Sequence, residues 1–167
     1  MSTSSGKAKT TEAATRHSLR RNRSAPPTIL VVEDHDDTRE MLHMLLERWG
    51  GRVVEACNGL EAVEAALRER PQLILMDSRL PFLDGLEATR RIRENGLSDQ
   101  VKIVALNGSG SPHYHAEALA AGCDDCIEKP FDFDWLRTYC SSILPLMPRG
   151  KTISQTSSTP ASAYLHV

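Results

Sequence analysis

The chain has 167 residues, a formal net charge of −2 and a hydrophobic content of 40%, so it has room for one domain of ordinary size plus tails. The charge is unevenly distributed, because residues 1–27 carry six Lys and Arg residues and one acid, whereas residues 28–146 carry 21 acids against 12 bases. An acidic body argues against nucleic-acid binding, since that affinity comes largely from basic groups that face phosphates.

The sequence also argues against a membrane protein and against a secreted one. No apolar run approaches the roughly 18 residues that a membrane crossing needs. The polar N-terminus lacks the hydrophobic segment of a secretory signal. The four cysteines are too sparse for a disulfide scaffold. These features predict a cytoplasmic protein.

The two ends of the chain differ in composition from its middle. Residues 1–27 contain few large apolar side chains and show no helical or strand period. Such a segment cannot bury enough surface to offset its chain entropy. We therefore expect a disordered basic tail over 1–27, one domain over 28–146 and a flexible polar tail, rich in Ser and Thr, over 147–167.

Within the middle, the sequence alternates five times between a strand pattern and an amphipathic helix pattern, which is typical of parallel βαβ units. The predicted strands are 28–33, 52–56, 73–77, 101–106 and 125–128. The first predicted helix runs from a cap at Asp36 or Asp37 to Gly50, and the second follows the strand 52–56 and stops near Pro71. The other three predicted helices are about 85–94, about 112–121 and 132–144. The first, third and fourth strands are unbroken apolar runs, which indicates helices on both faces of the sheet. The predicted fold is an α/β (βα)5 doubly wound five-stranded parallel sheet.

Apolar residues at helical spacing predict which face of each helix is buried. For the second helix the predicted inner residues are Leu60, Val63, Ala66 and Leu67. For the last helix they are Trp135, Leu136, Tyr139, Ile143 and Leu144.

Charged residues follow three of the predicted strands. Glu33 and Asp34 end the first apolar run, Asp77 ends the third, and Lys129 ends the fifth. Open α/β sheets bind their ligands at the carboxyl ends of the strands. If the three strands lie close together, three carboxylates and one ammonium converge on one pocket, a combination suited to Mg²⁺ and a phosphoryl group. His35 is expected to be a loop residue near the metal rather than a ligand.

These motifs resemble those of the receiver domain of two-component response regulators, and the resemblance spans about residues 28–146. The matching pieces are Glu33-Asp34, Met76-Asp77 with Pro81 and Asp84-Gly85, and Lys129-Pro130-Phe131. Each piece alone is weak, but all three occur in order at the ends of the expected strands. The resemblance implies a flavodoxin-like fold with strand order 2-1-3-4-5.

The resemblance also implies a phosphoprotein in a phosphorelay. Asp77 would attack a phosphohistidine of a histidine kinase or a histidine phosphotransfer protein and become an aspartyl phosphate. Mg²⁺ would be held by Asp34 and Asp77, by Glu33 through a water molecule and by the backbone carbonyl of Arg79. Lys129 would bind a phosphoryl oxygen.

Two residues depart from the family pattern at its switch positions. Asn107 stands where a Ser or Thr binds the phosphoryl group in relatives, and Cys126 stands where relatives have Tyr or Phe. An Asn amide can still donate to a phosphoryl oxygen, but a thiol has no ring to move. We hypothesise that the usual hydroxyl–aromatic coupling is absent or rebuilt. The resemblance further implies a cis peptide bond before Pro130, which would direct Lys129 into the pocket.

The expected role is that of a stand-alone receiver that signals by contact with a protein partner through the face of the fourth helix, fifth strand and fifth helix. A degenerate receiver that binds its partner without phosphorylation is the alternative, and Asn107 and Cys126 favour it. A separate enzymatic output is not expected. A small aspartate-dependent phosphatase would need a second Asp as general acid at position 79, which is Arg79.

Overall fold

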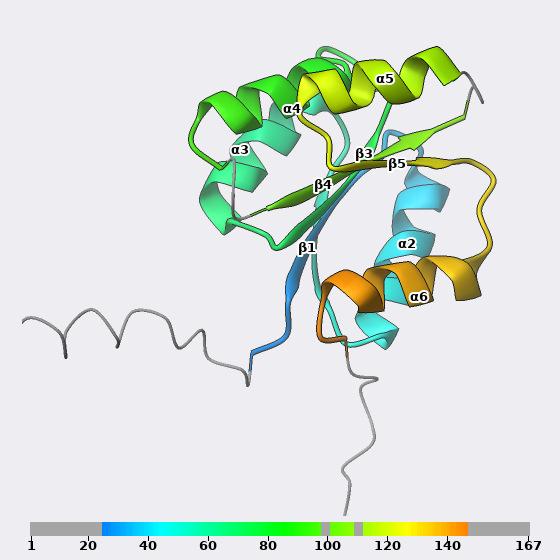
Figure 1. Cartoon of the computed structure of the whole chain (residues 1–167). Helices are drawn as coiled ribbons and strands as arrows, with labels where there is room; N and C mark the ends of the chain where they lie inside the picture. Colours follow the sequence, from blue (N-terminus) through cyan, green and yellow to red (C-terminus); the bar gives the residue numbers. More distant parts are fainter. Residues whose placement is uncertain (1–24, 98–100, 109–111, 147–167) are drawn as a thin grey trace, which may run out of the picture.

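The computed structural model describes residues 25–97, 101–108 and 112–146 of the chain. The described elements alternate strictly between strand and helix (Figure 1). In chain order they are β1 (Thr28–Val32), α2 (Asp36–Arg48), β2 (Arg52–Ala56), α3 (Gly59–Glu69), β3 (Leu73–Asp77), α4 (Gly85–Glu94), β4 (Lys102–Asn107), α5 (Pro112–Ala121), β5 (Asp125–Glu128) and α6 (Phe133–Ile143). Of the two predicted tails, 1–27 and 147–167, only residues 25–27 lie within the described part of the chain.

One parallel sheet forms the middle of the domain, with strand order β2-β1-β3-β4-β5. The prediction of a flavodoxin-like (βα)5 fold is confirmed. In the register of the sheet, Val32 pairs with both Ala56 and Met76, and Asp77 pairs with Leu106. The carboxyl ends of β1, β2, β3 and β4 therefore meet at the same edge of the sheet.

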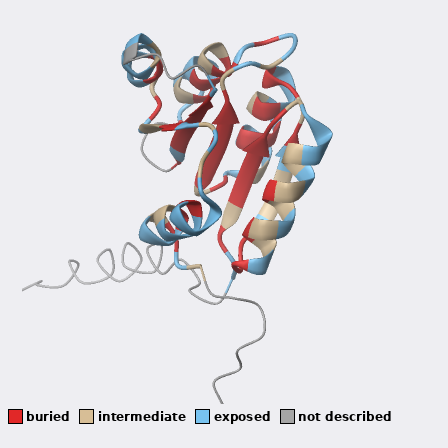
Figure 2. Cartoon of the chain, turned by 90° about the vertical axis from the view of Figure 1, so that its right-hand side faces the viewer, coloured by how far each residue is buried: buried red, intermediate tan, exposed pale blue. Residues whose placement is uncertain are grey.

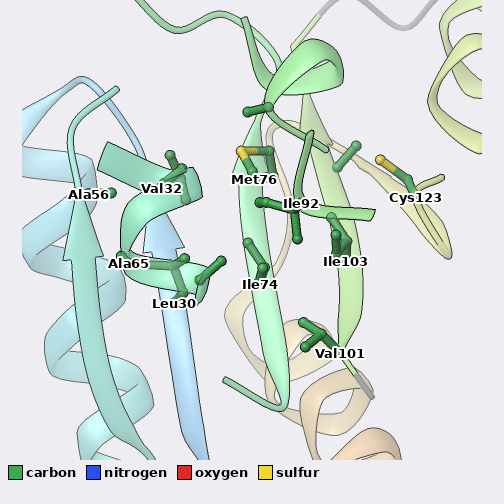
Figure 3. Close-up of a cluster of buried hydrophobic side chains, with 14 of the residues drawn as sticks. Leu30, Val32, Ala56, Ala65, Ile74, Met76, Ile92, Val101, Ile103 and Cys123 are labelled. Carbon is green, nitrogen blue, oxygen red and sulfur yellow. The ribbon is translucent and has the colours of Figure 1, made fainter. Parts of the chain in front are cut away.

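Helices cover both faces of this sheet, as the unbroken apolar strands predicted (Figure 1). Along β1 the side chains alternate: Leu30 and Val32 join the cluster that faces α3, α4 and α5, while Ile29 and Val31 join the cluster that faces α2 and α6. All four are fully buried. Figure 2 shows the strands as the buried centre between helices whose outer faces are exposed, and Figure 3 shows part of the first cluster. Burying one such side chain contributes about 1.5–3 kcal/mol.

The predicted boundaries differ from the structure by one residue in several places. The largest local correction is at the start of α2, where His35 is the N-cap and makes no side-chain capping bond. Asp36 and Asp37, the predicted caps, lie in the first turn instead. There their carboxylates still interact favourably with the positive end of the helix dipole, which explains the acidic start of α2.

The predicted inner stripe of α3 was partly wrong. Leu60 and Leu67 are exposed, and the fully or nearly buried side chains of this helix are alanines. The reason is a close approach: a Cβ atom at Gly59 would lie 2.0 Å from the backbone oxygen of Leu83. A helix that lies this close to its neighbours has room only for small side chains on its inner face.

In α6 the prediction failed at one position. Trp135 is 48% exposed and stacks on Tyr139, with 5.3 Å between ring centroids, whereas Leu136 is fully buried. None of the described helices combines the length and apolar character that a membrane crossing requires.

The side chain of Arg93 ties three segments together at the edge of the sheet opposite the charged residues. It donates to the backbone oxygens of Leu97, Val101 and Gly122 at 2.8–3.0 Å and pairs with Asp124 at 2.8 Å. We expect Arg93→Ala to lower the free energy of unfolding by about 2–3 kcal/mol, because it leaves several part-buried carbonyl groups without a donor. Urea unfolding followed by circular dichroism measures the change.

Arg90→Ala is the matched control, because Arg90 pairs only with Glu87 among the described residues and is exposed. An exposed pair of this kind contributes about 0–1 kcal/mol. Equal losses in the two variants would contradict the structural role given to Arg93.

Candidate functional site

The charged residues are fixed by hydrogen bonds that continue the sheet beyond its strands. The Glu33 amide donates to the Ala56 oxygen at 3.1 Å, and the Lys129 amide donates to the Asn107 oxygen at 2.7 Å. Asp77 is itself the last residue of β3. The backbone at all three positions is therefore held by neighbouring strands.

Lys129 bridges two buried carboxylates. Its Nζ lies 2.6 Å from Glu33 Oε2 and 2.7 Å from Asp77 Oδ1. Glu33 is 2% exposed and Asp77 is 7% exposed. Burial alone would lower the pKa of Lys129, but its hydrogen bonds to Asp77 and Glu33 raise that pKa above the ordinary lysine value. The ammonium is therefore charged at neutral pH and offsets the repulsion between the two acids.

The other side of Glu33 carries a more exposed group of ligand atoms. Glu33, Asp34 and His35 each place one possible metal ligand atom within 4.8 Å of the others. His35 Nδ1 lies 2.8 Å from Asp34 Oδ1 and 3.3 Å from Glu33 Oε1. The hydrogen bond to Asp34, followed by the charge of Asp34 and the contacts with Glu33, raises the pKa of His35. The sequence predicts His35 near the metal but not as a ligand, whereas the structure places its Nδ1 among the possible ligand atoms.

Asp77 is not part of that group of three. Its Oδ1 contacts Lys129, and its Oδ2 accepts a hydrogen bond from the Arg79 amide at 3.0 Å. The loop after it is closed tightly, since a Cβ atom at Gly85 would lie 2.1 Å from the Asp77 backbone oxygen. Asp84 then caps α4 by accepting from the Glu87 amide. The Asp84-Gly85 pair thus starts α4 directly against the end of β3.

The end of β4 lies beside this loop. Asn107 is 6% exposed at the last position of the strand. A Cβ atom at Gly108 would lie 3.6 Å from an Arg79 guanidinium nitrogen, so the Arg79 side chain extends over the end of β4. On β5, Cys126 is half-buried and packs against the first cluster, and burial raises the pKa of its thiol. The Lys129–Pro130 peptide bond is cis.

Comparison with known proteins identifies the family. The model of the response regulator receiver domain matches residues 29–141. The chain belongs to the response regulator receiver family. It is thus a receiver domain of two-component signalling, as the three motifs predicted.

Several relatives of this receiver have curated names or solved structures. The transcriptional regulatory protein SrrA of Staphylococcus aureus is 39% identical over 103 residues, which cover 62% of this chain and 42% of SrrA. The chain therefore matches less than half the length of that regulator. The receiver domain of sensor histidine kinase PA1611 from Pseudomonas aeruginosa PAO1, described with a magnesium ion coordinated in its active-site cleft, is 36% identical with a TM-score of 0.66. That match covers 71% of this chain and 98% of PA1611's domain.

The chemotaxis protein CheY4 of Vibrio cholerae is a further structural relative of this receiver. It is 28% identical with a TM-score of 0.67, and the match covers 72% of this chain and all of CheY4. The relatives thus include a receiver attached to a histidine kinase, one in a transcriptional regulator and a chemotaxis protein. Their shared feature is the receiver fold.

The structure of this receiver brings together Glu33, Asp77 and Lys129, which the sequence placed at the ends of three strands. Asn107 lies at the end of the strand between those of Asp77 and Lys129. Sequence reasoning missed Tyr114, whose buried hydroxyl lies on the side of α5 that faces the sheet. No strand-end motif marks that residue, and only its tertiary surroundings make it notable.

Proposed function

We propose that Asp77 accepts a phosphoryl group from a phosphohistidine of a histidine kinase or histidine phosphotransfer protein, with Mg²⁺ in the same pocket. The observation that carries this proposal is the position of the Lys129 ammonium, 2.7 Å from Asp77 Oδ1 and 2.6 Å from Glu33 Oε2. A cation held against a buried carboxylate can bind a phosphoryl oxygen as that carboxylate becomes an acyl phosphate.

In this reaction one carboxylate oxygen of Asp77 attacks phosphorus, the N–P bond of the phosphohistidine breaks, and the leaving imidazole takes up a proton from solvent. The Arg79 amide donates to Asp77 Oδ2, and the Lys129 ammonium donates to Asp77 Oδ1. Because each oxygen has its own donor, the carboxylate does not rotate freely. Lys129 offsets the negative charge that the phosphoryl group adds between Asp77 and Glu33. The Asn107 side chain would bind another phosphoryl oxygen.

The residues present suit a magnesium ion. Mg²⁺ binds oxygen ligands, usually one or two carboxylates with phosphate oxygens and waters. Glu33, Asp34 and Asp77 supply carboxylates, and Glu33 and Asp34 lie within the group of ligand atoms described above. We assign direct ligation to Asp34, Asp77 and the Arg79 carbonyl, and ligation through water to Glu33. When bound, the ion supplies positive charge that neutralises the phosphoryl oxygens.

The proposal is tested by incubating the chain with acetyl phosphate, with and without Mg²⁺, and measuring its intact mass. We expect a gain of one phosphoryl group that depends on Mg²⁺ and is lost with EDTA. A chain that stays unmodified while its fold is intact would contradict the proposal. That result would favour the alternative, a degenerate receiver that binds its partner without phosphorylation.

For the rest of the chain we propose a basic N-terminal segment over 1–27, the receiver over 28–146 and a polar C-terminal segment over 147–167; residues 1–24 and 147–167 lie outside the described residues. The downstream partner is a protein that contacts the face of α5, β5 and α6. β5 is the edge strand on this side of the sheet. A groove beside it is lined by Cys126, Ile127, Glu128, Phe131, Asp132 and Trp135.

Arg79 is expected to protect the aspartyl phosphate from water. Its guanidinium extends over Gly108 at the end of β4, the strand that pairs with the strand of Asp77. We expect Arg79→Ala to shorten the half-life of the phosphorylated chain about fivefold, the effect of one exposed charge-assisted contact. The half-life is measured as loss of the phosphorylated mass after acetyl phosphate is removed. Arg90→Ala, which changes an exposed Arg on α4, is the control, and equal half-lives in wild type and Arg79→Ala would refute the role.

A further inference from the structure

A tyrosine of α5 has a buried hydroxyl group that meets no hydrogen-bond partner within the described residues. Tyr114 lies in the first turn of α5, and its ring packs against the first cluster, as do Leu80, Leu86 and Cys126. Its hydroxyl oxygen is buried, and no hydrogen bond to it is formed by the described part of the chain. A buried polar atom in this state has lost its bonds to water and gained none, so it requires an explanation.

The surroundings of the hydroxyl show which part of the molecule it faces. Burial raises the pKa of Tyr114 far above its usual value, and Cys123, Cys126 and Asp77 act in the same direction. The Ser78 side chain acts in the opposite direction and so lies near the hydroxyl, although no hydrogen bond joins the two side chains in this structure. The ring packs against the cluster that contains Met76, the neighbour of Asp77, and that Cys126 of β5 also contacts. The hydroxyl therefore lies near the Asp77–Ser78 end of β3 and near β5. Figure 3 shows Cys123 at the margin of the same cluster.

We propose that Tyr114 relays the state of Asp77 to α5, because its hydroxyl gains a hydrogen-bond acceptor at the Asp77–Ser78 end of β3 when Asp77 carries a phosphoryl group. This inference rests on the proposed phosphorylation of Asp77 and adds the residue that responds to it. Phosphorylation introduces three acceptor oxygens at this place. It also gives Lys129, which contacts Asp77 in the present structure, a second oxygen group to bind.

Cys126 cannot perform this role itself. The Cys126 thiol is only a weak hydrogen-bond donor, and its side chain is much shorter than that of a tyrosine. Tyr114 packs against that cluster from the helix side, so a ring is present there although β5 does not supply it. Because Tyr114 belongs to α5, any movement of its ring acts on that helix directly. Ala118, one turn later, is fully buried and fixes the same face of α5 to the sheet.

The test compares the full chain with Tyr114→Phe, which keeps the ring and removes only the hydroxyl. Each protein, labelled with ¹⁵N, is titrated with beryllofluoride in the presence of Mg²⁺, since beryllofluoride mimics a phosphoryl group on Asp77. Amide signals of Asp77 and Ser78 report binding, and those of α5 and β5 report the response. Tyr139→Phe is the control for the loss of another phenol hydroxyl. Tyr139 packs on the opposite face of the sheet and donates to Asp125 of β5, so this variant shows how far such a loss by itself changes the β5 signals.

In wild type and Tyr139→Phe we expect binding at Asp77 to shift the signals of α5 and β5. In Tyr114→Phe we expect shifts at Asp77 and Ser78, much smaller shifts on α5 and β5, and beryllofluoride affinity lower by about fivefold, as for one hydrogen bond. Full-size shifts on α5 and β5 in Tyr114→Phe would overturn the inference alone. Failure of wild type to bind beryllofluoride at Asp77 would overturn the proposed function and this inference with it.

A second measurement follows the Tyr114 side chain itself in the wild-type chain. The chain contains three tyrosines, and labelling their ζ carbons with ¹³C gives one signal for each. The Tyr114 signal is assigned by its absence in Tyr114→Phe. We expect it to move when beryllofluoride binds to the wild-type chain, because its hydroxyl gains an acceptor. A Tyr114 signal that stays in place while the Asp77 amide shifts would also overturn the inference.

Discussion

Replacing Asp77 with Asn should abolish phosphorylation of the chain by acetyl phosphate and by any partner kinase. An amide nitrogen or oxygen does not form the acyl phosphate that a carboxylate forms, so the loss should exceed about a hundredfold, down to background. Asn has the same shape as Asp and can still accept a hydrogen bond from the Arg79 amide. The fold should therefore survive, and intact mass together with circular dichroism separates lost chemistry from lost structure.

Asp84→Asn is the matched control for this prediction. Asp84 lies in the loop that follows Asp77 and caps α4 by accepting from the Glu87 amide, a role that Asn also performs well. This control should be phosphorylated like wild type. If Asp77→Asn is still phosphorylated, peptide mapping would have to find the phosphoryl group on another acid, and the assignment of Asp77 would be wrong.

The sequence could predict the fold because each signal it used is local. Unbroken apolar runs such as 73–77 mark strands covered on both faces, and Gly and Asp at their ends mark where helices begin. The same signals predicted that Glu33, Asp77 and Lys129 would lie at one edge. They predicted a common pocket but not a direct contact between Lys129 and Glu33, because β5 is separated from β1 by β3 and β4. Neighbouring strands lie about 4.8 Å apart, so that contact depends on how the long Lys side chain crosses the edge.

The failures of sequence reasoning have a common physical origin. Leu60 and Leu67 were expected inside because leucine is apolar, but the depth of the helix is set by the close approach at Gly59. Trp135 was expected inside for the same reason and instead stacks on Tyr139 at the surface. Periodicity gives the direction in which a side chain points from its helix axis. Its burial depends on how much space the neighbouring helices and strands leave beside that helix.

Tyr114 shows the same limit at the candidate site. Its helix begins next to residues outside the described part of the chain, and its sequence neighbours His113 and His115 are polar and exposed. Nothing local indicates that its hydroxyl is buried without a partner. That property follows from the packing of α5 against the first cluster and so becomes visible only in three dimensions.

Replacing Lys129 with Met should destabilise the fold and make its stability fall as the pH rises. Without the ammonium, the buried Glu33 and Asp77 carboxylates face each other, and breaking a pair that is mostly buried should cost about 2 kcal/mol at pH 7. In the wild type the folded-state pKa of Lys129 is raised, so its contribution is complete below the unfolded value of about 10.4 and does not change between pH 5 and 8.

In Lys129→Met the two buried carboxylates repel each other with no cation between them, so the folded state with both acids charged is penalised relative to the unfolded chain. This penalty is relieved when one proton is taken up, so the deficit relative to wild type should be larger at pH 8 than at pH 5. Urea unfolding at both pH values measures this deficit in the free energy of unfolding.

Lys102→Met is the control, because Lys102 is 56% exposed and its pair with Asp124 should contribute little. A deficit in Lys129→Met that is equal at both pH values would show that the two carboxylates do not depend on Lys129, and the charge arrangement proposed for the phosphoryl site would be wrong.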